Sequence, residues 1–174
     1  MDPWVLINAA WYKGLTVEIG NTDAEGRVIL ADALAEAATD EPALLIDCAT
    51  LTGAARVALG PELPAMFTPD DDLARDLVDL GTSIGDPLWR LPLWKPYRRL
   101  IDGKVADLNN APDSPFAGAI TAALFLAEFA APVEHWAHID LMAWNTESRP
   151  GRPEGGEAMS MRAIYAVIEQ RFTR

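Results

Sequence analysis

The stretch LTVEIGNTDAEGRVILADALAEAATDEPALLIDC, residues 15–48, decides the fold. Its first part, Leu15 to Ile19, alternates apolar and polar side chains, the period of a strand with one buried face. From Arg27 to Ala38 apolar residues recur at helical spacing, and Asp40-Glu41-Pro42 ends that helix. The run Ala43 to Cys48 is short and largely apolar, as expected of a strand covered on both faces. This order predicts a right-handed crossover between two parallel strands that pair at the centre of an α/β sheet.

The rest of the chain continues the alternation of strands and helices. We therefore expect an α/β fold, with a mixed, centrally parallel β-sheet flanked by helices on both faces as an α/β/α sandwich. Three prolines interrupt residues 85–110, where we expect an ordered loop with a short helix. The other expected elements are a strand near Ala65-Met66-Phe67, a helix over Asp70–Leu80, a buried helix over Ala117–Val133, a last strand over Trp136–Leu141, and a helix over Glu157–Phe172 that carries Met161, Ile164, Tyr165 and Ile168 on one face.

Composition excludes several classes of partner and location. The 174 residues include 14 Lys plus Arg and 26 Asp plus Glu, a net charge of −12 that repels nucleic acids and anionic membranes. The longest apolar stretch is too short and too rich in alanine to span a bilayer, and the first residues lack the pattern of a signal peptide. The single cysteine, Cys48, lies in an apolar run, which indicates a buried thiol in a reducing compartment. We expect a cytoplasmic protein.

The segment Asn21-Thr22-Asp23-Ala24-Glu25-Gly26-Arg27 carries the most chemistry. From an extended backbone, two carboxylates separated by one residue point the same way and present several oxygens to one or two hard cations. Arg27 adds a guanidinium that stabilises an anionic intermediate or holds a bound anion. The alternative is that Asp23 and Glu25 only cap the following helix, where acidic side chains are favourable. The spacing does not distinguish the two interpretations.

Other polar residues give weaker signals. In a strand, His135 and His138 fall on opposite faces, so a shared metal is not expected and both histidines are assigned to the core or its rim. Ser160 and Cys48 lack the local motif of a nucleophile. Asp107, Asn109 and Asn110 either bind a ligand or form a turn, and the turn is favoured because Asp and Asn are common turn residues.

The run Thr16–Arg27, followed by Leu30-Ala31-Asp32-Ala33-Leu34, resembles the signature of the leucyl (cytosol) aminopeptidase family. A contiguous match from Asn21 to Arg27 rarely arises by chance, and Val28, in place of the family's usual leucine, keeps that position apolar. Further segments follow in the family's order from about residue 13 onward: Asp47 with Ala49–Ala54, Ala106–Asn110, Phe116–Ala123 and Trp136–Asp140.

The resemblance implies a zinc-exopeptidase-like fold and a dinuclear metallo-aminopeptidase, whose peptide substrates have a free amino terminus, with leucine preferred. It implies that Asp23 and Glu25 are ligands of two divalent ions, Mn or Zn, with Glu25 bridging them. Arg27 would be the catalytic arginine, with or without a bound bicarbonate, and Thr50, Leu51 and Gly53 would border the substrate. The family forms hexamers, so a homo-oligomer is implied as well.

The same resemblance indicates missing parts. Family members carry a lysine and two aspartates as further metal ligands upstream of this signature, together with a second catalytic lysine, and none can be assigned here. We therefore expect residues 1–12 to be an unassigned lead-in and residues 13–174 a partial catalytic domain, truncated at its amino-terminal side and inactive by itself. Residues 141–145 depart from the family pattern, which leaves the side-chain preference open. The alternative is a catalytically silent binding or assembly module.

Overall fold

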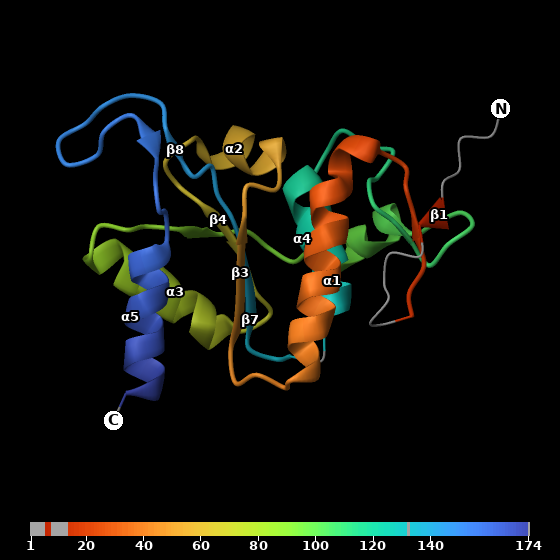
Figure 1. Cartoon of the computed structure of the whole chain (residues 1–174), viewed down its shortest axis with the longest axis horizontal. Coiled ribbons are helices and arrows are strands. Elements are labelled where there is room, and N and C mark those ends of the chain that lie inside the picture. The colour runs from red at the N-terminus through yellow and green to blue at the C-terminus, as the bar shows by residue number, and fades with distance from the viewer. Residues whose placement is uncertain (1–5, 8–13, 132, 174) are drawn as a thin grey trace. The chain divides into compact units, whose positions relative to one another are not determined.

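The computed structural model describes residues 6–7, 14–131 and 133–173, and the chain divides into two compact units (Figure 1). The first unit comprises the chain up to Leu45 together with Leu93–Trp136, and the second comprises Ile46–Pro92 and the chain from Ala137 onward. Both are built from short strands and helices, which confirms the predicted mixed α/β class. Within this described part of the chain, no helix combines the length and the apolar character that crossing a membrane requires.

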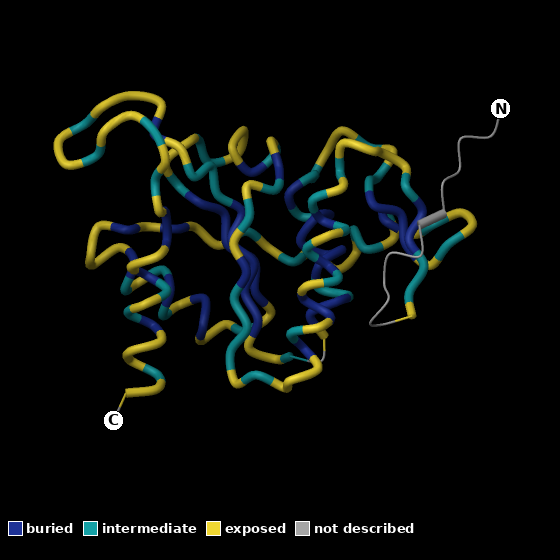
Figure 2. The backbone as a smooth tube through the Cα atoms, in the orientation of Figure 1, coloured by how far each residue is buried: buried dark blue, intermediate teal, exposed yellow. Residues whose placement is uncertain are grey.

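The first unit combines a small sheet of order β1-β2-β6 with two helices that pack against each other, α1 and α4. Strand β2 pairs antiparallel with β1 and parallel with β6, with Val17 opposite Leu108. Helix α4 is almost entirely buried, as Figure 2 shows. The elements are β1 (Leu6–Ile7), β2 (Val17–Glu18), the 3₁₀ turn η1 (Thr22–Ala24), α1 (Glu25–Thr39), η2 (Lys95–Ile101), β6 (Leu108–Asn109) and α4 (Gly118–Ala130).

A four-stranded sheet of order β3-β7-β4-β5 forms the centre of the second unit. The Leu45 amide donates to the His135 carbonyl at 2.9 Å and the Leu141 amide donates to the Ala49 carbonyl at 3.0 Å, so β3 and β7 run parallel. Strand β4 is antiparallel to β7 and parallel to β5. The elements are β3 (Leu45–Ala49), α2 (Gly53–Leu59), β4 (Ala65–Phe67), α3 (Asp71–Ser83), β5 (Trp89–Arg90), β7 (Trp136–Asp140), β8 (Trp144–Asn145), β9 (Gly155–Gly156) and α5 (Met161–Phe172).

Most of the predicted elements are present. Helix α1 begins two residues before the predicted start, because residues 25–26 already belong to it. The proline-interrupted region contains β5, the short helix η2 and β6, and Ile101 at the end of η2 is fully buried, as expected of an ordered loop. The predicted last strand is β7, but the short hairpin β8–β9 follows it.

The predicted parallel pair between residues 15–19 and 43–48 is wrong. Strand β2 pairs with β1 and β6, whereas β3 pairs with β7 in another sheet. Polar side chains near both ends of the β2–β6 pair explain this choice: Asp107 accepts hydrogen bonds from Thr16, and Asn110 accepts one from the amide of Gly20. Apolar periodicity carries no information about such partners, because they lie about 90 residues away in the sequence.

Helix α5 packs through a face other than the one its large apolar residues predict. Its buried residues are Ala163 and Val167, whereas Met161 is 59% and Tyr165 is 64% exposed. A Cβ atom placed on Gly81 of α3 would lie 3.2 Å from the Cβ of Ala163, so α3 and α5 approach closely through small residues. The bulky stripe of α5 therefore stays at the surface.

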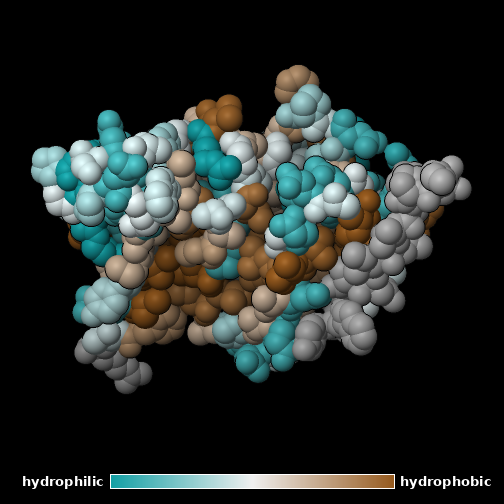
Figure 3. Space-filling model, turned by 45° about the horizontal axis from the view of Figure 1, so that its top comes forward, coloured by the Kyte–Doolittle hydropathy of each residue, from teal (hydrophilic) through white to brown (hydrophobic). Residues whose placement is uncertain are grey.

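Other large apolar side chains are exposed at the surface as well. On the face that Figure 3 presents, apolar areas lie between polar ones. The most exposed examples are Val57, Phe116 and Ile29, with exposed fractions of 89%, 77% and 68%. Contiguous exposed apolar surface is a common mark of contact surfaces between protein chains or segments.

The start of α5 depends on a carboxylate from outside the helix. Ser160, which precedes α5, has a φ of 63° and makes no side-chain capping bond. Instead, the buried Asp86 carboxylate accepts hydrogen bonds from the amides of Ser160, Arg162 and Ala163 at 2.9 to 3.2 Å. A negative charge at this position also complements the positive end of the helix dipole.

We predict that Asp86→Ala lowers the free energy of unfolding by about 2–4 kcal/mol, because it leaves three amides at a buried helix start without their acceptor. Asp79→Ala, at an exposed position of α3, is the matched control and should change stability by less than about 0.5 kcal/mol. Urea denaturation measures both variants. An Asp86→Ala variant as stable as the wild type would show that the cap does not stabilise α5.

Candidate active site

The segment that carries Asp23 and Glu25 folds as a turn into a helix. Asn21 is extended, with φ −144° and ψ 119°, and its side-chain oxygen accepts a hydrogen bond from the Asp23 amide at 2.9 Å. Thr22–Ala24 then form the 3₁₀ turn η1, and Glu25 begins α1. The backbone at Asp23 is therefore helical, and the extended backbone assumed from the sequence is wrong. We call residues 21–25 the carboxylate turn.

The carboxylates of this turn have no role in capping by hydrogen bonds. Asn21 caps η1, and Ala24, the residue that precedes α1, makes no side-chain bond. Asp23 and Glu25 are exposed, and neither carboxylate forms a hydrogen bond or ion pair with the residues that the structure describes. Glu25 lies in the first turn of α1, where its charge still complements the helix dipole. Both carboxylates thus keep their oxygens available for an external ligand.

Arg27 lies one helical step beyond the carboxylate turn and is 8% exposed. Its Nη1 donates a hydrogen bond to the backbone carbonyl of Asn110 at 2.8 Å. This hydrogen bond restrains the guanidinium group, because it joins Nη1 to the residue that directly follows β6. Asp23, Glu25 and Arg27 therefore all belong to the first unit and come from one short stretch of backbone.

Asn110 is a residue of this region whose importance sequence reasoning missed. It is fully buried, and its Oδ1 accepts hydrogen bonds from the amides of Gly20 and Asn21 at 2.9 and 3.1 Å. Its Nδ2 donates to the carbonyls of Asn21 and Ala24 at 2.7 and 3.3 Å. The predicted turn is formed by its neighbour Asn109, whose Oδ1 accepts from the amide of Ala111. Membership of the family-like segment Ala106–Asn110 was the available signal.

Asp107 serves the opposite end of the same strand pair. Its Oδ2 accepts hydrogen bonds from the backbone amide of Thr16 at 2.8 Å and from the Thr16 hydroxyl at 2.7 Å. The backbone bond, followed by the hydroxyl bond, holds the pKa of Asp107 below its ordinary value. Asp107 therefore links β2 to β6 without touching the carboxylate turn.

The residues expected to border a substrate lie in the second unit, where β3 leads into α2, and Gly53 is the first residue of α2. Thr50 and Gly53 are exposed and Leu51 is half-buried. The carboxylate of Asp140, at the end of β7, accepts hydrogen bonds from the amides of Leu51 and Thr52 at 3.0 and 3.1 Å. It also accepts from the Thr52 hydroxyl at 2.5 Å, and the same hydroxyl accepts from the amide of Ala55 to cap α2. Asp140 therefore fixes the Thr50–Gly53 loop.

A second polar pair is enclosed between β3 and β7. The Nδ1 of His138 lies 2.5 Å from Oδ1 of Asp47, and their side chains are 1% and 8% exposed. The His138 ring also stacks on Phe67, with ring centroids 6.1 Å apart. His135 is exposed. These positions agree with the assignment of the histidines to the core or its rim, and they favour a structural role for the buried pair.

The expected burial of Cys48 is wrong, because its side chain is exposed. Cys48 lies in β3, an edge strand of the described sheet. Surrounding chain nevertheless desolvates the thiolate and the neighbouring Asp47 carboxylate repels it, which together raise the pKa of Cys48 to about 11. A thiol with such a pKa is a poor nucleophile at neutral pH, consistent with the absence of a nucleophile motif.

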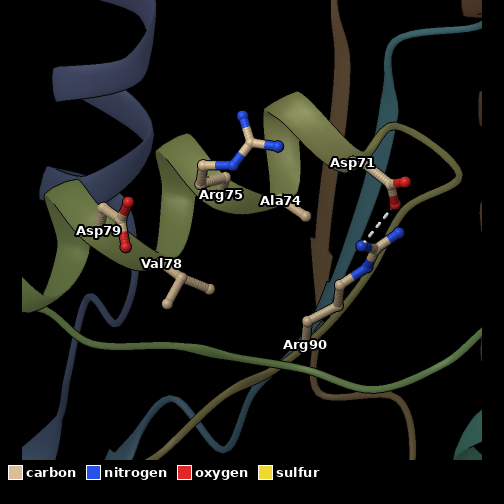
Figure 4. Close-up of a pocket in the computed structure, with 6 residues that line it drawn as sticks. All are labelled: Asp71, Ala74, Arg75, Val78, Asp79 and Arg90. Atoms are coloured by element: carbon tan, nitrogen blue, oxygen red, sulfur yellow. Dashed lines mark ion pairs between the residues drawn. The ribbon is translucent and has the colours of Figure 1, made fainter.

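The surface also contains a hollow of about 440 Å³, between α3 and β5 (Figure 4). Charged side chains dominate its lining, and Arg90 and Asp71 form an ion pair there at 2.7 Å. None of the residues singled out from the sequence lines it. Among the described residues, no three or more His, Cys, Asp or Glu side chains come together in an arrangement that could hold a metal ion.

Comparison with known proteins identifies the class. Residues 9–165 match the catalytic domain of the cytosol aminopeptidase family. The chain therefore belongs to the cytosol aminopeptidase family, as its Asn21–Arg27 segment suggested.

Individual relatives give the same result. A probable cytosol aminopeptidase from Syntrophotalea carbinolica is 46% identical over 160 residues, which cover 91% of this chain and 32% of that protein. The crystal structure of the Coxiella burnetii cytosol aminopeptidase matches with a TM-score of 0.90 and 53% sequence identity. The match covers 99% of this chain and 37% of the Coxiella chain. The structure of the bottromycin maturation enzyme BotP in complex with Mn matches with a TM-score of 0.84 and 40% sequence identity. The match covers 90% of this chain and 36% of the BotP chain. The chain spans about a third of the length of these relatives.

We predict that Cys48 reacts with a disulfide reagent such as Ellman's reagent about tenfold to a hundredfold more slowly in the folded chain than in urea at pH 8. A raised pKa lowers the thiolate fraction, and the greater intrinsic nucleophilicity of a basic thiolate offsets only part of this loss. The rate should climb steeply as the pH approaches 11. Equal rates for the folded and the unfolded chain at pH 8 would show that the surroundings of Cys48 do not suppress its ionisation.

Proposed function

We propose that this chain is part of a metal-dependent aminopeptidase, which removes amino-terminal residues, leucine preferentially, from peptides with a free amino terminus. The observation that carries the proposal is the pair of exposed carboxylates of Asp23 and Glu25, which have no partner among the described residues and lie on a turn held by the side chain of Asn110, in a chain of the cytosol aminopeptidase family. In this assignment residues 13–174 are part of the catalytic domain. The location we propose is the cytoplasm, where the family's name places its members.

The donor chemistry of the carboxylate turn suits a hard divalent ion, because carboxylate oxygens are the ligands that such ions prefer. In this proposal Asp23 and Glu25 would be ligands of a centre of two divalent ions, Mn or Zn. The described residues contain no group of three or more possible ligands, so in this proposal they supply only part of the metal's ligands. Bound ions of this type lower the pKa of a coordinated water and polarise the scissile carbonyl group. The Mn complex of the related BotP supports the choice of manganese.

Arg27 suits the role of an electrophilic residue. A guanidinium keeps its positive charge at any physiological pH, and its several N–H groups allow one of them to be tied to the Asn110 carbonyl while the charge acts elsewhere. In the proposed reaction Arg27 stabilises the negative charge that develops on the substrate's carbonyl oxygen, or it holds a bicarbonate that moves the proton. Its burial strengthens either interaction, because the local dielectric constant is low.

Thr50, Leu51 and Gly53 would border the substrate, on a loop that Asp140 holds in one conformation. The amides of Leu51 and Thr52 are used in holding the loop to Asp140, and the exposed surface of Thr50 and Gly53 suits contact with a peptide. We also propose a homo-oligomer, a hexamer by family resemblance. The exposed apolar side chains, with Phe116 at 77% and Val57 at 89%, support association of this chain with other subunits or segments.

Calorimetric titration with Mn²⁺ tests the metal assignment. We predict weak binding to the wild-type chain, and a loss of affinity of at least about tenfold for Asp23→Asn or Glu25→Gln, because each variant removes a charged oxygen ligand. Glu36→Gln, at an exposed position of α1, makes the same change of charge and should leave the affinity unaltered. Complete indifference of the wild-type chain to both Mn²⁺ and Zn²⁺ would favour a silent binding or assembly module.

A peptidase assay on leucyl substrates tests whether the chain is active by itself. We predict little or no turnover with added manganese or zinc, because two carboxylates and an arginine do not fix a pair of metal ions. Robust hydrolysis that disappears with a chelator would contradict this expectation. Such a result would mean that the 174-residue chain suffices for catalysis.

A further inference from the structure

The carboxamide of Asn110 uses its full hydrogen-bonding capacity on one short segment. A primary amide has two acceptor sites on its oxygen and two donor hydrogens on its nitrogen. In Asn110 all of these meet backbone groups of Gly20, which precedes the carboxylate turn, and of Asn21 and Ala24 within it. The Asn110 side chain is therefore hydrogen-bonded to the backbone both before and within the carboxylate turn.

The same residue also contacts the arginine that follows the turn. The Asn110 carbonyl accepts the hydrogen bond from Nη1 of Arg27, while the Asn110 amide donates to the Glu18 carbonyl at 2.9 Å. Asn110 is fully buried, so these bonds form out of reach of competing water. One residue, itself anchored to β2, therefore restrains the backbone of the carboxylate turn and the guanidinium group of Arg27.

Joining β2 to β6 would be a simpler role for Asn110. However, Asp107 also links the two strands, at the other end of this pair, where its carboxylate accepts two hydrogen bonds from Thr16. The partners of the Asn110 side chain lie beyond the last residue of β2, in the turn itself. This difference makes Asp107 a matched control, because both residues link the same strands and only one of them contacts the turn.

We propose that Asn110 is a positioning residue that sets the conformation of the carboxylate turn and the place of the Arg27 guanidinium group. Its relevance to metal ligands rests on the proposed function. Ligand and catalytic groups must be held to within about 0.5 Å of their working geometry, and a short polar turn does not achieve this without outside support. Aspartate at this position lacks both donors, and an apolar side chain removes all four hydrogen bonds to the backbone of residues 20–24.

The first experiment measures the order of the turn by ¹⁵N relaxation in the 174-residue chain. In the wild type, the amides of Asp23, Ala24 and Glu25 should show order parameters of about 0.8 or higher, typical of rigid backbone. In Asn110→Ala they should fall below about 0.6, although Asn110 accepts no bond from any of these three amides. Asp107→Ala should leave them unchanged. Retained order in Asn110→Ala would overturn the proposal.

The second experiment titrates the same variants with Mn²⁺ and follows paramagnetic broadening of the amides of residues 22–26. Asn110→Ala should need at least about tenfold more Mn²⁺ than the wild type for equal broadening, whereas Asp107→Ala should match the wild type. A disordered turn that still responds to Mn²⁺ like the wild type would overturn the positioning role.

Two further comparisons separate the possible failures. Absence of broadening in the wild-type chain would contradict the proposed metal site, and the order parameters would still decide the role of Asn110. If Asn110→Ala does not fold, Asn110→Asp replaces it, since this variant keeps the acceptor oxygen and the side-chain size. It should loosen Ala24 more than Gly20, because only the donated bonds are lost.

Discussion

Hydrogen bonds from one buried carboxamide to four backbone groups hold the carboxylate turn in place. The Asn110 side chain satisfies two amides and two carbonyls of residues 20–24, which have few other partners because β2 ends just before them. With the turn fixed, Asn21 is free to cap η1 and α1 begins at Glu25. Asp23 and Glu25 are then left exposed and unpartnered among the described residues, which suits carboxylates that bind a cation.

The second unit uses a related arrangement at the end of β7. There the buried carboxylate of Asp140 accepts hydrogen bonds from two amides and a hydroxyl of the Thr50–Gly53 loop, which leads directly into α2. In both units a buried polar side chain just beyond or at the end of a strand orders a loop that follows another strand. Fully satisfied polar contacts of this kind make the loops that they hold more rigid.

The sequence predicted the local elements well, because α1, β3, β4, α3, α4 and β7 each depend on periodicity within a single stretch. It also singled out Asp23, Glu25 and Arg27, through one contiguous segment. Partners distant in the sequence were not predictable: Asn110 lies about 90 residues from the turn that it holds, and the pairing of β2 with β6 depends on such contacts. The packing face of α5 was missed because Gly81 and Ala163 favour close approach over the burial of larger side chains. The exposure of Cys48 was missed because apolar neighbours in a strand do not reveal which of its side chains other elements cover.

Anomalous diffraction at the manganese absorption edge, from crystals of the chain grown in a manganese salt, tests most directly whether the turn held by Asn110 presents cation ligands. We predict a manganese peak about 2.1–2.4 Å from carboxylate oxygens of both Asp23 and Glu25, with the hydrogen bonds of Asn110 intact. An ordered carboxylate turn with no manganese beside it, in crystals that bind manganese at other carboxylates, would contradict the account.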